Sequence, residues 1–177
     1  MRVRSGRFKG RELAYPRAGL RPTKDITRQA IFNILADRIA GALVLDLFAG
    51  GGSLGLEALS RGAARAVFVE RDAATLRCLR ANLAGIAEAE TVRGTLPGAL
   101  GRLAGQEFDI VIADPPYRKG LVGECVAAVA AHGLVAPGGV LVVEHAAAEP
   151  PAAPEGWSVL KQAKYGDTLV TIIRRPE

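Results

Sequence analysis

Hydrophobic positions follow two different spacings along residues 42–177. Continuous apolar runs, such as ALVLDL at 42–47 and FDIVIA at 108–113, are typical of strands that are covered on both faces. Between the runs, apolar residues recur at helical spacing, as in Leu76, Leu79 and Leu83. The chain is therefore expected to alternate strands with helices. The expected strands are 42–47, 66–70, 90–93, 108–113, 138–146 and two more that flank a turn near 165–167.

This order of elements predicts a fold class. Strands that alternate with helices form a parallel sheet with right-handed crossovers. The last two strands are joined by a short turn, so they must pair antiparallel. We expect an α/β fold with a doubly wound, mostly parallel seven-stranded sheet and a C-terminal antiparallel hairpin. Ligands of such sheets bind at the carboxyl ends of the strands.

The first part of the chain has another pattern. The segment RVRSGRFKGRELAYP is expected to form a small hairpin or ordered arm, turned at Ser5-Gly6 or Lys9-Gly10. Thr23 or Asp25 can then cap a helix that runs to about Arg38. We therefore divide the chain into a basic N-terminal hairpin or arm, residues 1–24, and a main domain, residues 25–177.

Positive charge is concentrated in the same segment. The chain of 177 residues has a net charge of +5, but residues 1–28 hold nine basic and two acidic residues and so carry +7. Because Val3, Phe8, Leu13 and Tyr15 stand among these charges, we expect an ordered surface that binds a polyanion, with nucleic acid as the expected partner. The residues expected to contact it are Arg2, Arg4, Arg7, Lys9, Arg11 and Arg21.

Several classes of protein are disfavoured by the sequence. No apolar run reaches the ~18 residues that cross a bilayer, and no apolar stretch follows the basic N-terminus as in a secretory signal. Two cysteines cannot make a disulfide framework, and Cys125 lies on an apolar helical stripe, so we expect the cytoplasm. His132 and His145 have no cysteine or acid cluster at ligand spacing, so we expect no metal site. We expect a monomer.

The segment DLFAGGGSLG predicts a nucleotide pocket after the first strand. It places Gly50, Gly52 and Gly55 between a strand and a helix, where glycine lets the backbone approach a ligand closely. Glu70, at the end of the second strand, can accept hydrogen bonds from ribose hydroxyls. A dinucleotide and S-adenosylmethionine both fit this pattern. Asp46 favours the second, because a carboxylate attracts a sulfonium and repels a diphosphate; alternatively, Asp46 caps a backbone turn.

The tetrapeptide Asp114-Pro115-Pro116-Tyr117 predicts the chemistry. An exocyclic amine on a base is a poor nucleophile because its lone pair is spread into the ring. Two acceptors, the Asp114 carboxylate and the Pro115 carbonyl, can localise that lone pair, and consecutive prolines hold the chain stiff. Tyr117 offers a face for base stacking, which contributes ~1–3 kcal/mol. The target base must be flipped out or unpaired to enter such a pocket.

Longer stretches resemble a known family. GLRPTKDITRQAIFNIL, LDLFAGGGSLGLEALSRGA, FVERD, DPPYRKG and YGDTLV are similar to segments of the bacterial RsmD family of class I methyltransferases. That resemblance covers nearly the whole chain. It implies S-adenosylmethionine as cofactor, N2 of a guanine in 16S ribosomal RNA as target, and a pocket closed by Arg21, Pro22 and Thr23.

The resemblance also implies a set of site residues. The residues expected to bind the methyl donor are Asp46, Phe48, Gly50, Gly52, Gly55, Glu70, Arg71, Thr95 and Thr23, and those expected to hold the base are Asp114, Pro115, Pro116 and Tyr117. The chain departs from the family pattern in two places. Related enzymes often carry an acid where this chain has Gly94-Thr95, and Ile26 and Gln29 replace an arginine and a glutamate.

We therefore expect an S-adenosylmethionine-dependent methyltransferase that acts on small-subunit ribosomal RNA, in an assembled or assembling subunit. The alternatives are an amino-methyltransferase with the same pocket that acts on DNA, other RNA or protein, a dinucleotide-dependent oxidoreductase, and a non-catalytic RNA-binding domain. The chain lacks a large target-recognition domain, which DNA methyltransferases of this type often carry, and this favours RNA.

Overall fold

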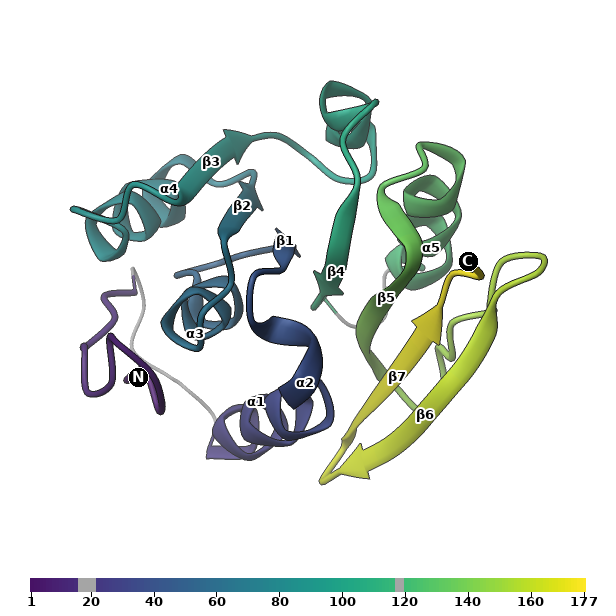
Figure 1. Ribbon diagram of the computed structural model, residues 1–177, viewed down its shortest axis with the longest axis horizontal. Coiled ribbons are helices and arrows are strands. Elements are labelled where there is room, and N and C mark those ends of the chain that lie inside the picture. Colours follow the sequence, from purple (N-terminus) through teal and green to yellow (C-terminus); the bar gives the residue numbers. More distant parts are fainter. Residues whose placement is uncertain (16–21, 117–119) are drawn as a thin grey trace.

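A seven-stranded sheet of order β3-β2-β1-β4-β5-β7-β6 runs through the computed structural model, which describes residues 1–15, 22–116 and 120–177 (Figure 1). The helices are α1 (Pro22–Ile34), α2 (Ala36–Ile39), α3 (Ser53–Ser60), α4 (Ala73–Asn82), the 3-10 helix η1 (Gly98–Leu103) and α5 (Leu121–Ala131). The strands are β1 (Leu43–Leu47), β2 (Arg65–Glu70), β3 (Ala89–Arg93), β4 (Phe108–Ala113), β5 (Val135–Ala146), β6 (Ser158–Tyr165) and β7 (Thr168–Arg174).

The pairing of the strands confirms the predicted fold class. The first five strands of the sheet pair in parallel, and β7 pairs antiparallel with both β5 and β6. β1 pairs with β2 on one side and with β4 on the other, so the strand order reverses beside β1. In open parallel sheets, ligands bind at the carboxyl ends of the strands at such a reversal.

Helices cover both faces of the sheet, which explains the continuous apolar runs. One core lies between the sheet and α1–α4, and β1 contributes Val44 to it. The second core lies between the sheet and both η1 and α5, and β1 contributes Leu45 and Leu47 to it. Since successive residues of a strand point to opposite faces, Asp46 points to the same side as Val44, toward α3.

The first helix differs from its prediction. A single helix from Thr23 or Asp25 to about Arg38 was expected, but α1 begins at Pro22 and is followed by a separate short helix, α2. Proline fits the first turn of a helix because its missing N–H would have no partner there. Asp25 therefore lies inside the first turn of α1, where its carboxylate pairs with Arg28 at 2.9 Å and with Arg4.

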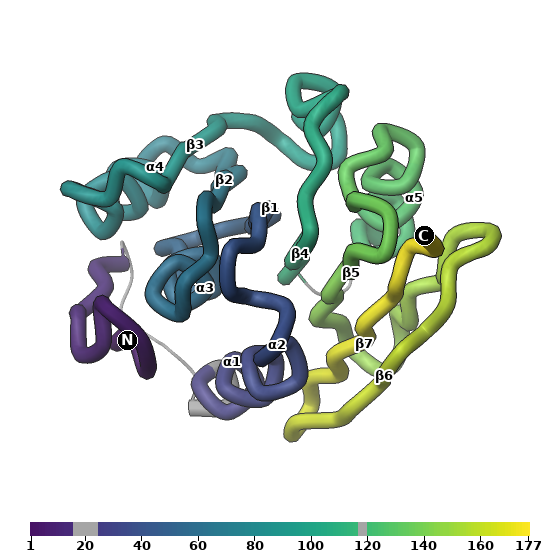
Figure 2. The backbone as a smooth tube through the Cα atoms, in the orientation of Figure 1, coloured from purple at the N-terminus to yellow at the C-terminus, as the bar shows by residue number. Residues whose placement is uncertain are grey.

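Residues 1–15, which we call the arm, fold back on themselves as predicted. Arg2 and Glu12 form an antiparallel bridge, and both Gly6 and Gly10 adopt positive φ between them. The arm lies at the left edge of the molecule beside α3 (Figure 2), where the Arg7 N–H donates to the carbonyl of Ser60 at 2.8 Å. Val3 and Leu13 are buried in the same core as α1–α4. The arm is thus packed onto the sheet and its helices.

Candidate active site

A pocket of about 540 Å³ lies at the carboxyl ends of the parallel strands, where the order reverses. Its volume falls within the roughly 300–1,000 Å³ of small-molecule sites. The residues that line it are Phe48, Val69, Glu70, Arg71, Gly94, Thr95, Leu96, Asp114, Pro115, Pro116, Leu121, Asp167 and Thr168. The fold thus brings the segment after β1 and the segment after β4 to one cavity, as the sequence predicted.

The loop after β1 turns sharply above the sheet. Phe48 adopts φ of 61°, a left-handed conformation that is uncommon for a residue with a Cβ, and Gly50 and Gly52 follow with φ of 55° and 84°. The Gly52 N–H donates to the carbonyl of Ala49 at 2.8 Å and closes the turn. This turn brings the Phe48 side chain to the wall of the pocket.

Glu70 ties this loop to the end of β2. One carboxylate oxygen, Oε2, accepts the Gly50 N–H at 2.9 Å, and the other, Oε1, accepts the Asp72 N–H at 2.8 Å. A carboxylate offers about four acceptor positions, so each oxygen retains capacity for another donor. Glu70 lines the pocket, and two backbone hydrogen bonds fix it in a geometry that can accept a pair of ligand hydroxyls.

Asp46 lies beneath the loop and does not appear among the lining residues. Its side chain is 1% exposed, and its Oδ2 accepts the Gly55 N–H at 2.8 Å. This hydrogen bond agrees with the alternative interpretation, in which Asp46 caps a backbone turn. Burial, together with repulsion by Asp114 and Glu70, raises the pKa of Asp46 to about 8.

Two of the predicted glycines also lie behind the pocket wall. A Cβ on Gly55 would collide with the ring of Phe68, and a Cβ on Gly52 would lie 2.5 Å from Cδ1 of Leu79. These contacts show that Gly52 and Gly55 allow α3 and its loop to pack closely against β2 and α4. Neither they nor Gly50 are among the residues that line the pocket.

Asp114 and the prolines form the opposite wall. Asp114 follows the last residue of β4 and is half-buried, Pro115 is buried, and Pro116 is exposed. Because β4 pairs with β1, the Asp114 N–H donates to the carbonyl of Leu47, the residue after Asp46, at 3.5 Å. Glu70 and Asp114, which both line the pocket, give this end of the sheet a negative potential that suits a cationic ligand. The raised pKa leaves Asp46 mostly protonated near pH 7, so it adds little to this potential, contrary to the role the sequence predicted for its charge.

Three parts of the wall were missed by sequence reasoning. Leu96, which is buried, joins Phe48 and Val69 in an apolar region. Leu121 comes from the first residue of α5. Asp167 and Thr168 come from the turn between β6 and β7, so the C-terminal hairpin completes the cavity. The motif YGDTLV was noted in the sequence, but nothing local indicated that its turn reaches the site.

Of the other predicted residues, some line the pocket and some lie outside the residues that the structure describes. Arg71 and Thr95 line the pocket, and Gly94 does so where an acid is often found in related enzymes. Tyr117 and Arg21 lie outside the described residues, and the side chain of Thr23 is likewise not described. Sequence reasoning therefore finds seven of the lining residues: Phe48, Glu70, Arg71, Thr95, Asp114, Pro115 and Pro116.

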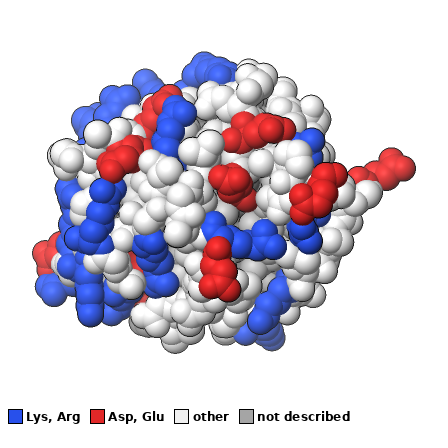
Figure 3. Space-filling view, viewed as in Figure 1, with Lys and Arg blue, Asp and Glu red and all other residues white. Residues whose placement is uncertain are grey.

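The basic residues of the arm are largely engaged within the protein. Arg2 pairs with Glu12, Arg4 with Asp25, and Arg7 with Glu88 at 2.9 Å. The guanidinium of Arg11 donates to the carbonyl of Ala84 at 3.0 Å, and Lys9 is exposed. Figure 3 shows many basic side chains along the left side of the molecule, where the arm and α4 lie in Figure 1.

Residues 1–15, 22–116 and 120–177 contain neither a cluster of metal-binding side chains nor a helix that could span a membrane. No group of three or more His, Cys, Asp and Glu side chains there could hold a metal ion. In the same residues, no helix has both the length and the apolar character needed to cross a membrane. His145 is fully buried, and its Nε2 lies 2.8 Å from the hydroxyl of Thr171.

Comparison with known proteins agrees with the resemblance. Residues 1–174 match the model of the family described as Conserved hypothetical protein 95. The chain is 38% identical to ribosomal RNA small subunit methyltransferase D of Escherichia coli K12, over 99% of this chain and 90% of that protein. It is 33% identical to the Haemophilus influenzae protein of the same name, over 94% and 89%. The solved structure of Escherichia coli yhhF superimposes with a TM-score of 0.89 at 38% identity and covers 99% of this chain and 98% of that one. The chain therefore belongs to the Conserved hypothetical protein 95 family, the family of ribosomal RNA small subunit methyltransferase D.

Proposed function

We propose that the protein transfers the methyl group of S-adenosylmethionine to the exocyclic N2 amine of a guanine in small-subunit ribosomal RNA. Membership of the family supports the activity and the class of substrate. The observation that carries the proposal is that Glu70 and Asp114 line the same pocket from two sides. One carboxylate is suited to a ribose and the other to an amine.

The lining residues fit the methyl donor. When bound, S-adenosylmethionine supplies a methyl group on a cationic sulfur. Glu70 has acceptor capacity for the two ribose hydroxyls, and Phe48, Val69 and Leu96 offer an apolar surface for the adenine. The negative potential of Glu70 and Asp114 attracts the cation. The same potential disfavours a dinucleotide, because its diphosphate would meet these two carboxylates, and Arg71 is the one basic side chain among the lining residues that the structure describes.

Asp114 and Pro115 would orient the target amine. The Asp114 carboxylate accepts one amine hydrogen and the Pro115 carbonyl accepts the other, which localises the nitrogen lone pair. Pro115 and Pro116 hold these acceptors in place because proline restricts both its own φ and the residue before it. Tyr117 is proposed to stack on the base. The scheme works by positioning and electrostatics and requires no strong general base.

The proposal extends to the arm and the setting of the reaction. Residues 1–24, which include the arm, are proposed to bind nucleic acid, and residues 25–177 are proposed as the methyltransferase domain. The burial of Val3 and Leu13 in the main core supports an arm that is fixed relative to the pocket. We propose a monomer that acts in the bacterial cytoplasm on the assembled or assembling small ribosomal subunit.

The test is methylation of small ribosomal subunits that lack the modification. The protein is incubated with isotopically labelled S-adenosylmethionine, and the labelled nucleoside is identified after digestion of the RNA. We expect N2-methylguanosine. Asp114→Asn, which keeps the shape but removes the charge, should lower kcat at saturating donor by more than about 100-fold, the magnitude of losing one preorganised electrostatic contact. Donor binding is measured separately by calorimetry.

The matched control is Asp109→Asn at the other end of β4. Asp109 is exposed, and its carboxylate accepts the Leu43 N–H at 2.8 Å. This variant should methylate the subunit like the wild type. Label in another nucleoside, or no label despite donor binding, would overturn the assignment of the guanine N2. Failure to bind the donor would overturn the choice of cofactor.

A further inference from the structure

The arm has less free positive charge than its composition indicates. Three of its arginines form ion pairs with Glu12, Asp25 and Glu88. Arg28, which also contributes to the charge of residues 1–28, is 2% exposed and pairs with Asp25. Charges that are already neutralised by a carboxylate are poorly placed to bind a phosphate. Among the described residues of the arm, Lys9 and Arg11 are left without a carboxylate partner, so a larger group of unpaired arginines would bind phosphate more strongly.

Five exposed arginines lie on or next to β2, α4, β3 and η1, and we call them the arginine band: Arg71, Arg77, Arg80, Arg93 and Arg102. Within the part of the chain that the structure describes, none of them forms an ion pair. Arg80 donates to the hydroxyl of Thr91 at 3.2 Å, and Arg102 donates to the carbonyl of Arg93 at 2.7 Å. A guanidinium has five N–H donors, so each retains most of its capacity.

The acidic residues of this region are occupied. Asp72 accepts the N–H of Thr75 at 2.7 Å and caps α4. Glu88 pairs with Arg7 of the arm, and Glu90 pairs with Arg65 of the neighbouring strand. Arg71 shares the pocket with Glu70 and Asp114, and the other four arginines of the band face solvent without a carboxylate as ion-pair partner among the described residues. Unpaired arginines that surround one edge of the sheet are suited to phosphate, which a guanidinium can bind through two parallel hydrogen bonds.

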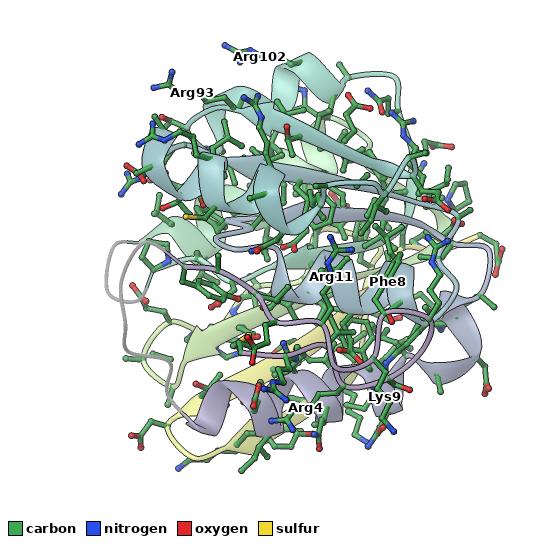
Figure 4. All side chains as sticks on the ribbon, turned by 90° about the vertical axis from the view of Figure 1, so that its left-hand side faces the viewer. Arg4, Phe8, Lys9, Arg11, Arg93 and Arg102 are labelled. Carbon is green, nitrogen blue, oxygen red and sulfur yellow. The ribbon has the colours of Figure 1, made fainter. Side chains whose placement is uncertain are left out.

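The band wraps the outer edge of the sheet. Arg77 and Arg80 lie on α4, which covers one face, Arg93 ends the edge strand β3, and Arg102 lies on η1, which covers the other face. Figure 4 looks at this side of the molecule and shows Arg93 and Arg102 projecting outward at the top. The labelled residues of the arm lie lower on the same side.

The band is continuous with both the pocket and the arm. Arg71 lines the pocket, and Gly94, which follows Arg93, lines it as well. At its other end, α4 holds the arm through Asn82, whose amide donates to the carbonyl of Ala14 at 2.9 Å. A strand of RNA that crosses the band would thus be led from the rim of the pocket toward the arm.

We infer that the arginine band binds the phosphates of the RNA strand next to the target guanine and is the principal electrostatic contact of this protein with its substrate. This inference rests on the proposed function. It assigns phosphate binding to α4, β3 and η1 in preference to the arm, where the sequence had placed it.

The test compares two double variants with the same change of charge. Arg77→Gln/Arg93→Gln removes two members of the band whose side chains make no hydrogen bond or ion pair within the described residues. Lys161→Gln/Lys164→Gln removes two exposed charges on β6, at the opposite edge of the sheet. Binding to small ribosomal subunits is measured by sedimentation from 50 to 200 mM KCl at constant Mg²⁺, with donor binding measured by calorimetry.

For the band variant we expect a dissociation constant raised at least ten-fold near 100 mM KCl, with unchanged donor binding. The slope of log K against log salt should fall by about 1.4–1.8, since each phosphate contact contributes about 0.7–0.9. KM for the subunit should rise while kcat stays within two-fold. The lysine variant should differ from the wild type by less than two-fold in all of these values.

Each outcome bears on the inference. Equal binding of the two double variants would overturn the band while leaving the methyltransferase intact. Binding that depends on the band without methyl transfer by the wild type would support the surface and overturn the proposed function. Absence of wild-type binding to the subunit at every salt concentration would overturn both.

Discussion

Asp46 is predicted to make the stability of the protein fall as pH rises. Its carboxyl is buried beneath the loop that follows β1, and the Gly55 N–H, which donates to it at 2.8 Å, is the polar partner that the structure gives it. The pKa of Asp46 rises from 3.8 to about 8 on folding, chiefly because burial disfavours the charged form. Asn at this position keeps an oxygen acceptor for Gly55 but cannot ionise.

The sign and the size follow from proton binding. Between pH 4 and pH 8 the folded protein holds a proton on Asp46 that the unfolded chain has released, so the free energy of unfolding decreases with pH. Each pH unit costs ~1.4 kcal/mol within this window. From pH 5 to pH 8, we expect the wild type to lose about 3–4 kcal/mol relative to Asp46→Asn. The loss ends above the folded pKa of about 8.

Urea unfolding of both proteins from pH 5 to pH 8.5, without donor, measures this difference. Trp157, the one tryptophan of the chain, packs against the second core and reports unfolding by fluorescence. Asp109→Asn is the control, because its carboxylate also accepts a backbone N–H but is exposed to water. A constant difference between the wild type and Asp46→Asn, within about 1 kcal/mol over this range, would refute the argument from burial.

Three other results are expected. Gly51→Ala places a Cβ 2.5 Å from the ring of Tyr15 and should lower the free energy of unfolding by about 1–3 kcal/mol. Adding Tyr15→Ala to the same chain should restore part of this loss, and urea unfolding of the double-mutant cycle measures it; purely additive losses would contradict the prediction. Asn82→Ala removes hydrogen bonds to the arm and to the carbonyl of Gly51 and should lower the free energy of unfolding by about 1–3 kcal/mol. Amide hydrogen exchange in residues 2–15 should become faster, and unchanged exchange would show that Asn82 does not hold the arm. Burial raises the pKa of Cys125 to about 12, so a disulfide reagent at pH 8 should label the half-buried Cys78 first and reach Cys125 only with unfolding. Mass spectrometry measures the two labelling rates, and equal rates would contradict the prediction.

Much of the fold could be predicted because the signals are local. The continuous apolar run of β4 indicates a strand that is covered on both faces. The helical spacing of Leu76, Leu79 and Leu83 indicates a helix that is buried on one face. The antiparallel hairpin follows from a turn that is too short for a crossover. Asp72 caps α4 as a residue of its type should, through the Thr75 N–H. The start of α1 was predicted wrongly: Thr23 or Asp25 was expected to cap the helix, but the helix begins at Pro22, a residue that suits the first helical position.

The sequence by itself thus determined which segments form strands and helices, the class of sheet, and the two stretches that meet at its carboxyl edge. The tertiary structure alone decided that Asp46 binds Gly55, that Gly52 and Gly55 accommodate Leu79 and Phe68, and that the turn at Asp167 completes the pocket. It also decided which arginines are paired and which are free. The reason is that backbone conformation and periodicity are properties of neighbouring residues. Partners such as Arg7 and Glu88 are far apart in sequence, and only the packing of the sheet and its helices brings them together.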